Sequence, residues 1–292
     1  MKRFLFACWL ASLPLLAADH ALHISAGGRD VAVWKPAGAA PEAGSPLVVF
    51  SHGFGGCNTQ SAFLMEALAN AGYLVVAPNH ADASCGSAHA HRGRSGGWRP
   101  EEPFQKAAEW SDTTYKDRRA DIESVLAAVL SGKSFQGVRV DAGRVGIAGH
   151  SLGGYTALGV AGAWASWRDP RIKAVLALSP YNTPFVAKGD LGHVNMPVMF
   201  QGGTLDFGIS PTVRHPGGAY DRSSSPKYYV EFQGAGHLAW TDLNPRFHSV
   251  INRYSIAFFD RYLKGDASPA ELAALFDRTR PSGISLLRSD AK

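Results

Sequence analysis

The chain has 292 residues, of which 46% are hydrophobic and 18% are charged, and its formal net charge is +5 at pH 7. This composition is typical of a globular protein with one large core or two small ones, and it excludes a disordered or fibrous chain. Lys and Arg are spread along the chain apart from one local cluster at residues 89–99, whereas nucleic-acid binders usually gather them on one element. We therefore expect no nucleic-acid partner.

The first 18 residues have the pattern of a secretory signal peptide. Lys2 and Arg3 precede an apolar run from Phe4 to Ala18 that ends in small residues. The run is too short and too interrupted to form a permanent transmembrane helix. We therefore expect cleavage, export to the periplasm or medium, and no stable membrane insertion. An uncleaved N-terminal anchor is the alternative. Cys8 lies inside the run rather than at its end, which disfavours a lipoprotein.

Two cysteines, Cys57 and Cys85, remain after removal of this leader. An even number of cysteines suits an oxidising compartment. A Cys57–Cys85 disulfide is one interpretation of the pair, and two small buried thiols are the other.

Apolar runs and helical periodicities alternate along the rest of the chain. Residues 20–36 predict a short hairpin around a Gly-Gly turn. Continuous apolar runs predict strands at residues 47–50, 73–77, 144–148, 172–178, 198–201 and 227–232. Helical periodicity predicts helices at residues 61–71, 114–131 and 152–165, and a last helix that opens at 244–245 with an Asn cap and a Pro.

Non-alternating strands interleaved with helices predict an α/β fold with a mainly parallel sheet covered on both faces. We expect one domain over residues 19–292 with a sheet of about eight strands. Residues 81–112 are rich in Gly, Ser, His and Arg and are expected to form a surface loop.

The segment Gly149-His150-Ser151-Leu152-Gly153 matches the G-x-S-x-G pattern of a nucleophile elbow. It lies between a predicted strand and a predicted helix, which is the setting that the motif requires. Its glycines remove side chains that would clash in the strained turn, and the helix N-terminus favours the negative charge that develops in acyl transfer. We therefore predict that Ser151 is a nucleophile. A structural serine in a Gly-rich turn is the alternative.

A serine hydroxyl needs a base, and in this fold the chain order is Ser, acid, His. His237 lies in a loop directly after the strand 227–232, where a base belongs. His248 lies on a predicted helix, and His193 and His215 lie in loops before a strand or far from a strand end. The sequence therefore predicts His237 as the base.

Asp206 follows the predicted strand 198–201 and is the expected acid. A carboxylate there would orient the imidazole and stabilise its charged form. The rivals Asp190 and Asp221 lie in loops that are less well placed. An Asp that only caps a turn is the alternative for Asp206.

Two backbone N–H groups must stabilise the oxyanion. Leu152 should supply one, because it follows the nucleophile. The Gly-rich loop at residues 51–56 should supply the other, and Phe54 is the best single candidate. His52 is expected to brace this loop by hydrogen bonding rather than to carry a proton.

Four segments, residues 49–56, 117–122, 144–154 and 202–206, resemble the dienelactone hydrolase / platelet-activating-factor acetylhydrolase-like branch of the α/β-hydrolases. The chain is also similar to bacterial cutinases and polyester hydrolases in the spacing of acid and base. Only residues 181–196 separate two strands where many hydrolases insert a helical lid, so no lid domain is expected.

The resemblance implies the α/β-hydrolase fold, with Ser151 as nucleophile, Asp206 as acid, His237 as base, and Phe54 and Leu152 as oxyanion donors. Dienelactone hydrolases proper use a cysteine nucleophile, so the serine argues against that activity. The Ser-His-Gly-Phe loop also differs from the usual oxyanion loop of cutinases.

His80, Asp82, His89 and His91 raise the question of a metal site, but their spacing does not aim them together. We expect a solvated loop there and no metal.

Three aromatic residues lie near the expected chemistry. Trp98 has arginines beside it and is a candidate for the mouth of the cleft, with a solvated basic loop as the alternative. Phe207 and Trp240 are neighbours of the acid and base segments and are candidate apolar walls for substrate; core packing is the alternative.

These features predict an exported serine hydrolase that cleaves small-molecule or polymeric carboxylic esters through an acyl-enzyme, with no cofactor. A serine peptidase is the rival enzyme, and a catalytically inactive binding module is the rival from another class. The sequence leaves the oligomeric state open.

Overall fold

The computed structural model describes residues 21–38, 41–84, 100–188, 190–265, 269–276 and 282–291. The expected leader at residues 1–18 lies outside these ranges. The division into a leader and one domain over residues 19–292 therefore stays a prediction.

A single sheet forms the centre of the described structure. Its strand order is β1-β2-β4-β3-β6-β7-β8-β9-β10, and the short strand β5 pairs with β6 beside this path. Neighbours from β4 to β9 pair in parallel, whereas β1, β2 and β10 pair antiparallel at the two edges. The strands are β1 (Leu22–Ala26), β2 (Arg29–Trp34), β3 (Ser45–Ser51), β4 (Leu74–Pro78), β5 (Ser134–Phe135), β6 (Val138–His150), β7 (Ile172–Leu178), β8 (Val198–Gly203), β9 (Lys227–Phe232) and β10 (Ile284–Asp290).

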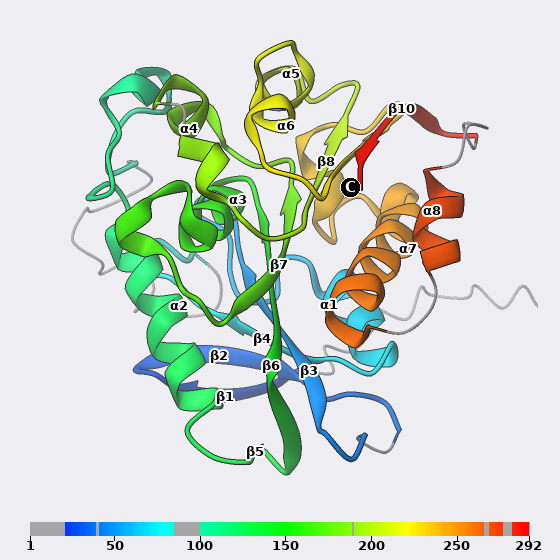
Figure 1. Cartoon of the computed structure of the whole chain (residues 1–292). Helices are drawn as coiled ribbons and strands as arrows, with labels where there is room; N and C mark the ends of the chain where they lie inside the picture. Colours follow the sequence, from blue (N-terminus) through cyan, green and yellow to red (C-terminus); the bar gives the residue numbers. More distant parts are fainter. Residues whose placement is uncertain are drawn as a thin grey trace, which may run out of the picture.

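Helices cover both faces of this sheet. Figure 1 shows α2 and α3 on one side, and α1, α7 and α8 on the other. The helices are α1 (Ala62–Asn70), α2 (Lys116–Val129), α3 (Leu152–Leu158), α4 (Thr183–Lys188), α5 (Ser210–Arg214), α6 (Ala219–Arg222), α7 (His248–Phe259) and α8 (Pro269–Leu275). The α/β-hydrolase fold and its mostly parallel sheet are thereby confirmed.

The strand β3 shows why the sheet needs helices on both faces. All seven of its residues are buried. Successive side chains of a strand point to opposite faces. Leu47 and Val49 accordingly join the core under α2 and α3, whereas Val48 and Phe50 join the core under α1 and α7.

Two predicted elements need correction, and one strand was not predicted. The helix that opens at residues 244–245 is not the last one: a short 3-10 turn at Pro245–Phe247 leads into α7, and α8 follows. Helix α3 ends at Leu158 and continues as a π-helical turn at Gly159–Ala163. The strand β10 was not predicted, because it lies at an edge and most of its side chains are only half-buried.

The prediction of a surface loop at residues 81–112 is wrong for the second half of this range. The 3-10 helix η2 (Phe104–Glu109) lies there, and Trp110 behind it is fully buried. The ring of Trp110 packs against Tyr155 of α3 and Tyr181, which follows β7. Between β7 and β8 the described residues form only α4 and the 3-10 helix η5 (Asp190–His193).

Candidate active site

Ser151 lies on a sharp turn between β6 and α3. Its backbone has φ 57° and ψ −117°, which a residue with a side chain adopts only under strain. A Cβ atom at Gly149 would lie 2.1 Å from the Gly153 carbonyl oxygen, and one at Gly153 would lie 1.9 Å from the Ser51 carbonyl oxygen. Both flanking positions therefore require glycine, and the turn lifts the Ser151 hydroxyl off the edge of the sheet.

Three side chains that are far apart in the sequence meet at this edge. Asp206 follows β8, and His237 follows β9. The His237 Nε2 atom lies 2.9 Å from the Ser151 Oγ atom, and His237 Nδ1 lies 3.1 Å from Asp206 Oδ1. The His237 side chain is 37% exposed, whereas that of Asp206 is 3% exposed. The arrangement suits proton transfer from the hydroxyl to the imidazole, with the carboxylate behind it.

Two hydroxyl groups hold the carboxylate of Asp206. Ser179 donates to Oδ2 at 2.5 Å, and Ser210 donates to the same oxygen at 3.0 Å. Burial opposes ionisation of Asp206, but the hydrogen bonds from His237, Ser179 and Ser210 outweigh it and hold its pKa below the usual value. Asp206 is therefore an anion at neutral pH.

Ser179 is a site residue that the sequence did not indicate. It directly follows β7, is fully buried, and has a positive φ of 41°. Its Oγ atom also lies 2.9 Å from His237 Nδ1. Since the Ser179 proton goes to Asp206, its oxygen accepts from the imidazole N–H, so Ser179 bridges acid and base. A lone serine after a strand carries no motif that would have revealed this.

His150 and Gln60 connect the loops around Ser151. Gln60 Nε2 donates to His150 Nδ1 at 2.9 Å, and His150 Nε2 donates to the His237 carbonyl oxygen at 2.9 Å. Gln60 Oε1 accepts the Gly53 N–H at 3.0 Å. Burial, followed by the nearby His237, lowers the pKa of His150 to about 3, so the ring stays neutral. No sequence pattern indicated a role for either residue.

The two expected oxyanion donors lie on either side of Ser151. Leu152 opens α3, and Phe54 lies on the loop after β3, beside the elbow. Among the described residues, neither the Phe54 N–H nor the Leu152 N–H donates to another protein group. His52 is fully buried and donates from Nδ1 to the Gly53 carbonyl oxygen at 2.7 Å, so it braces the loop as expected.

The candidate substrate-contacting aromatics have different surroundings. Trp240 is fully buried and its indole N–H donates to Gln201 at 3.0 Å, so it belongs to the core and is not a wall. The 3-10 helix η6 (His237–Trp240) turns this side chain inward. Phe207 is 76% exposed. Trp98 lies outside the described residues.

Two further hydrophobic side chains of the segments that carry Asp206 and His237 are exposed: Leu205 to 55% and Leu238 to 53%. Each of the three is a chain neighbour of Asp206 or His237. We call Leu205, Phe207 and Leu238 the apolar rim. An exposed apolar side chain next to the acid or the base in the chain is a candidate contact for an apolar substrate.

His80 and Asp82, two members of the suggested metal cluster, have other partners. His80 Nδ1 lies 2.9 Å from Asp121, and Asp82 accepts two hydrogen bonds from Arg118. Within the described ranges no group of His, Cys, Asp and Glu is arranged to hold a metal ion. His89 and His91 lie outside those ranges.

Cys57 is disulfide-bonded. Its expected partner, Cys85, lies outside the described residues, so the Cys57–Cys85 pairing stays a prediction.

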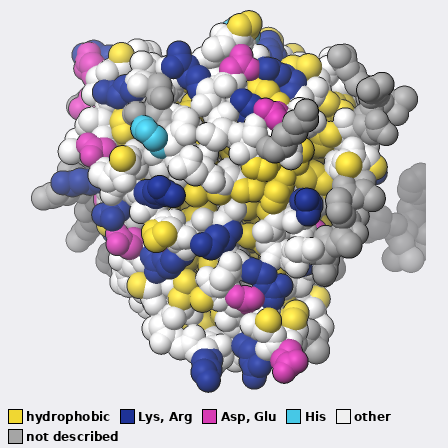
Figure 2. All heavy atoms as spheres, viewed as in Figure 1, with side chains coloured by type: hydrophobic (Ala, Val, Ile, Leu, Met, Phe, Trp, Pro, Cys, Tyr) yellow, Lys and Arg dark blue, Asp and Glu magenta, His cyan; other side chains and the backbone are white. Residues whose placement is uncertain are grey.

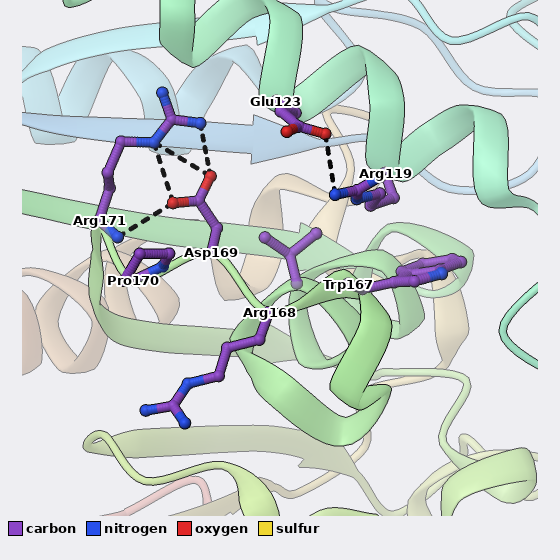
Figure 3. A pocket seen from close by; sticks show the side chains of 8 residues that line it. Arg119, Glu123, Trp167, Arg168, Asp169, Pro170 and Arg171 are labelled. Atoms are coloured by element: carbon purple, nitrogen blue, oxygen red, sulfur yellow. Dashed lines mark hydrogen bonds and ion pairs between the residues drawn. The ribbon is translucent and has the colours of Figure 1, made fainter.

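A separate pocket of about 210 Å³ lies at the opposite end of β7 from Ser179. Four of its charged groups are paired within the lining, Arg171 with Asp169 at 2.6 Å and Arg119 with Glu123 at 3.0 Å (Figure 3). Arg168 also lines the pocket, so the lining carries one more positive than negative charge.

The surface of the molecule does not carry a continuous basic area on the face shown in Figure 2, where Lys and Arg lie scattered among other side chains. None of the helices in the described part of the chain is long and apolar enough to cross a bilayer.

Comparison with known families gives two matches. The family described as PET hydrolase-like matches residues 111–284, which is more than half of the chain. The family described as platelet-activating factor acetylhydrolase, isoform II, matches residues 17–124.

Individual relatives are similar over shorter stretches. Cutinase 1 of Thermobifida cellulosilytica is 31% identical over 130 residues, which cover 44% of this chain and 44% of the relative. Bis(hydroxyethyl) terephthalate hydrolase of Streptomyces coelicolor is 29% identical over 160 residues, or 53% and 47% of the two chains. Cutinase est1 of Thermobifida alba is 24% identical over 221 residues, or 75% and 61%. The chain spans about half the length of the relatives it matches.

Proposed function

This chain belongs to the PET hydrolase-like family, and from that premise we propose that it is an exported serine hydrolase that cleaves carboxylic esters. The observation that carries the proposal is the unbroken hydrogen-bonded series Asp206–His237–Ser151, which ends on a strained turn at the mouth of the site. Cutinases and a terephthalate-ester hydrolase among the similar proteins support the ester as substrate.

Acylation begins when the Ser151 oxygen attacks the ester carbonyl carbon. His237 Nε2 takes the hydroxyl proton, while Asp206 accepts the hydrogen bond from Nδ1–H and stabilises the imidazolium. The N–H groups of Phe54 and Leu152 donate to the oxyanion. When the tetrahedral intermediate collapses, the imidazolium gives its proton to the departing alcohol.

Deacylation repeats these steps with water. His237 removes a proton from the water molecule, the resulting hydroxide attacks the acyl-enzyme, and the proton returns to the Ser151 oxygen as the acid leaves. His237 carries each proton that moves, first from Ser151 to the alcohol and then from water to Ser151, so the mechanism calls for no cofactor.

Apolar esters are the substrates that the apolar rim favours. Leu205, Phe207 and Leu238 are exposed, and each directly precedes or follows the acid or the base in the chain. When an apolar substrate binds to this rim, each Å² of apolar surface removed from water contributes about 25 cal/mol to the free energy of binding. This observation favours polyester hydrolysis as a second candidate beside the cleavage of small esters.

A substrate panel tests the main proposal. We expect the purified protein to hydrolyse p-nitrophenyl esters and to be labelled by a fluorophosphonate at Ser151, with little action on amino-acid p-nitroanilides. Preference for the anilides would identify a peptidase instead. Failure to hydrolyse either and to take the label would identify an inactive binding module.

Polyester film tests the second candidate. Phe207→Ser together with Leu238→Ser should reduce hydrolysis of the film by more than it reduces hydrolysis of soluble p-nitrophenyl acetate. Leu22→Ser is a matched control, because Leu22 is exposed but lies on the edge strand β1. Equal losses on film and soluble ester would argue against a role of the rim in binding polymer.

A further inference from the structure

The peptide bond between Gly53 and Phe54 is held from one side. Its carbonyl oxygen, on Gly53, accepts three hydrogen bonds: from His52 Nδ1 at 2.7 Å, from the Gly56 N–H at 3.0 Å and from Arg118 Nη2 at 3.3 Å. In a trans peptide the C=O and N–H groups point in opposite directions. Holding the Gly53 carbonyl therefore fixes the direction of the Phe54 N–H.

The preceding peptide is held from both sides. The His52 carbonyl oxygen accepts from Arg118 Nη1 at 2.8 Å, and the Gly53 N–H donates to Gln60 Oε1 at 3.0 Å. The guanidinium of Arg118 thus contacts two successive carbonyls of the loop. The planar fork of an arginine is suited to this task, because it presents several donors in fixed directions.

Arg118 is itself anchored. It lies in the first turn of α2 and is fully buried, and its Nη2 donates to both carboxylate oxygens of Asp82 at 2.8 Å and 2.7 Å. Burial opposes ionisation of Asp82, but the charge of Arg118 outweighs it and lowers the pKa of Asp82 to about 2. The pair stays ionised at neutral pH, which compensates the buried charge of the guanidinium.

The imidazole ring of His52, which donates to the Gly53 carbonyl, has a defined tautomer. The His80 backbone N–H donates to His52 Nε2 at 3.0 Å, so the ring proton of His52 is on Nδ1 and faces the Gly53 carbonyl. Burial and then the neighbouring Arg118 lower the pKa of His52 well below its ordinary value. His52 is therefore a neutral donor at every pH where the enzyme is expected to work.

We propose that Arg118 is a positioning residue of the oxyanion hole: with His52 it clamps the 52–54 backbone so that the Phe54 N–H faces the oxyanion that forms when Ser151 attacks the ester carbonyl. This inference rests on the proposed ester hydrolysis. The guanidinium also polarises the two peptide units whose carbonyls it binds, which makes the Phe54 N–H a stronger donor.

Thionoesters give a readout that is specific to the oxyanion hole. Sulfur replaces the carbonyl oxygen and accepts hydrogen bonds weakly, so a misdirected N–H slows cleavage of an oxoester far more than that of the matched thionoester. A variant that only loosens the fold slows both. The ratio of the two kcat values therefore separates positioning from stability.

The variant to use is Arg118→Met combined with Asp82→Leu. Replacing both partners of a buried ion pair with apolar side chains is often tolerated by the fold, whereas replacing one leaves a buried charge. We expect the double variant to keep a cooperative thermal transition and to lower the oxoester-to-thionoester ratio by on the order of 10- to 100-fold. Arg119→Met is the control, because Arg119 is the next residue of α2 but pairs with Glu123 away from the loop, and it should keep the wild-type ratio.

A folded double variant that keeps the wild-type ratio would overturn the clamp while leaving ester hydrolysis standing. If the double variant does not fold, Asp82→Asn with Arg118 retained is measured in the same way: it loosens the anchor of Arg118, so an unchanged ratio there would overturn the clamp as well. Wild-type protein that cleaves no ester would overturn the proposed function and the clamp together.

Discussion

The described part of the chain contains two Ser–His–Asp clusters with nearly the same geometry. In one, Ser151, His237 and Asp206 are joined by distances of 2.9 Å and 3.1 Å. In the other, the Ser51 Oγ atom lies 2.8 Å from His80 Nε2, and His80 Nδ1 lies 2.9 Å from Asp121 Oδ2. Distances alone therefore do not distinguish a nucleophile from a structural serine.

Access and backbone distinguish the two clusters. Ser51 is the last residue of β3 and is fully buried, and the His80 side chain is 0% exposed. Ser151 is half-buried on its elbow, at the N-terminus of α3, and faces a ring that is partly exposed. Only the arrangement at Ser151 leaves room for an ester carbon and supplies donors for the ester oxygen.

The acids also differ in their support. Asp121 pairs with Arg29 at 2.6 Å, whereas Asp206 receives hydroxyl hydrogen bonds from Ser179 and Ser210. A guanidinium adds a fixed positive charge that would compete with an imidazolium for the carboxylate. Neutral hydroxyls hold Asp206 in place and leave its charge available to His237.

Replacing the two serines should give the largest contrast. Ser151→Ala removes the attacking oxygen, so kcat should fall by about 10⁴- to 10⁶-fold. Ser51→Ala should change kcat by less than about tenfold, since the Ser51 hydroxyl hydrogen-bonds to His80 at the buried end of β3. Steady-state kinetics on p-nitrophenyl acetate and peptide mapping after fluorophosphonate labelling measure both; label on Ser51 would contradict the assignment.

Replacing the two acids should separate catalysis from stability. Asp206→Asn should lower kcat by about 10⁴-fold with little change in melting temperature, because the base loses its orienting charge. Asp121→Asn should leave kcat close to wild type but lower the free energy of unfolding by roughly 1–3 kcal/mol, because charged hydrogen bonds to buried partners are lost. Urea unfolding and steady-state kinetics on both variants test this contrast. If both variants lost the same kcat and the same free energy of unfolding, the two acids would have the same role.

Lowering the pH should reduce the stability of the protein, and the buried cluster of Ser51, His80 and Asp121 is one cause. Burial and then the charge of Arg118 lower the pKa of His80 well below its ordinary value, so the native state keeps this ring neutral. The unfolded chain binds the proton below about pH 6.5, so stability is lost as the pH falls below that value, by up to ~1.4 kcal/mol per pH unit for each such histidine. His150, with a pKa of about 3, adds to the same trend.

Urea unfolding between pH 7 and pH 4 measures this trend. His80→Gln should flatten the dependence, although it lowers stability at neutral pH. Ser51→Ala, which keeps the histidine, should retain the slope. A stability that is level over this range in the wild type would show that these rings are charged in the native state.

The smallest expected effect concerns the hydroxyl between acid and base. Ser179→Ala removes the donor to Asp206 and the acceptor beside His237 Nδ1, so kcat should fall by about tenfold with KM unchanged. Ser223→Ala is the control, because Ser223 is also buried and its hydroxyl donates to the Ala219 carbonyl oxygen, away from the acid and the base. A loss that appears in KM rather than in kcat would assign Ser179 to substrate binding instead.

The elbow at Ser151 could be predicted because its causes lie within a few residues. The Gly-x-Ser-x-Gly spacing, the buried strand before it and the helix after it are local patterns, and the structure has all three. The chain order of nucleophile, acid and base likewise pointed to Asp206 and His237, which the structure brings to Ser151.

Chain proximity was a poor guide to side-chain direction. Trp240 lies three residues after His237, yet η6 turns it into the core. The long segment before α2 was expected to be a surface loop, although its end packs Trp110 under α3.

The sequence by itself therefore determined the fold class and pointed to the three side chains that we propose to react, because strand and helix periods and a five-residue turn are set by neighbours along the chain. The tertiary structure alone decided which Ser–His–Asp set is open to solvent, and it alone revealed Ser179, Gln60 and Arg118. Each of these residues has a hydrogen-bond partner that lies 27 to 90 positions away in the chain. Contacts over such separations depend on strand register and on the paths of loops, which no local pattern encodes.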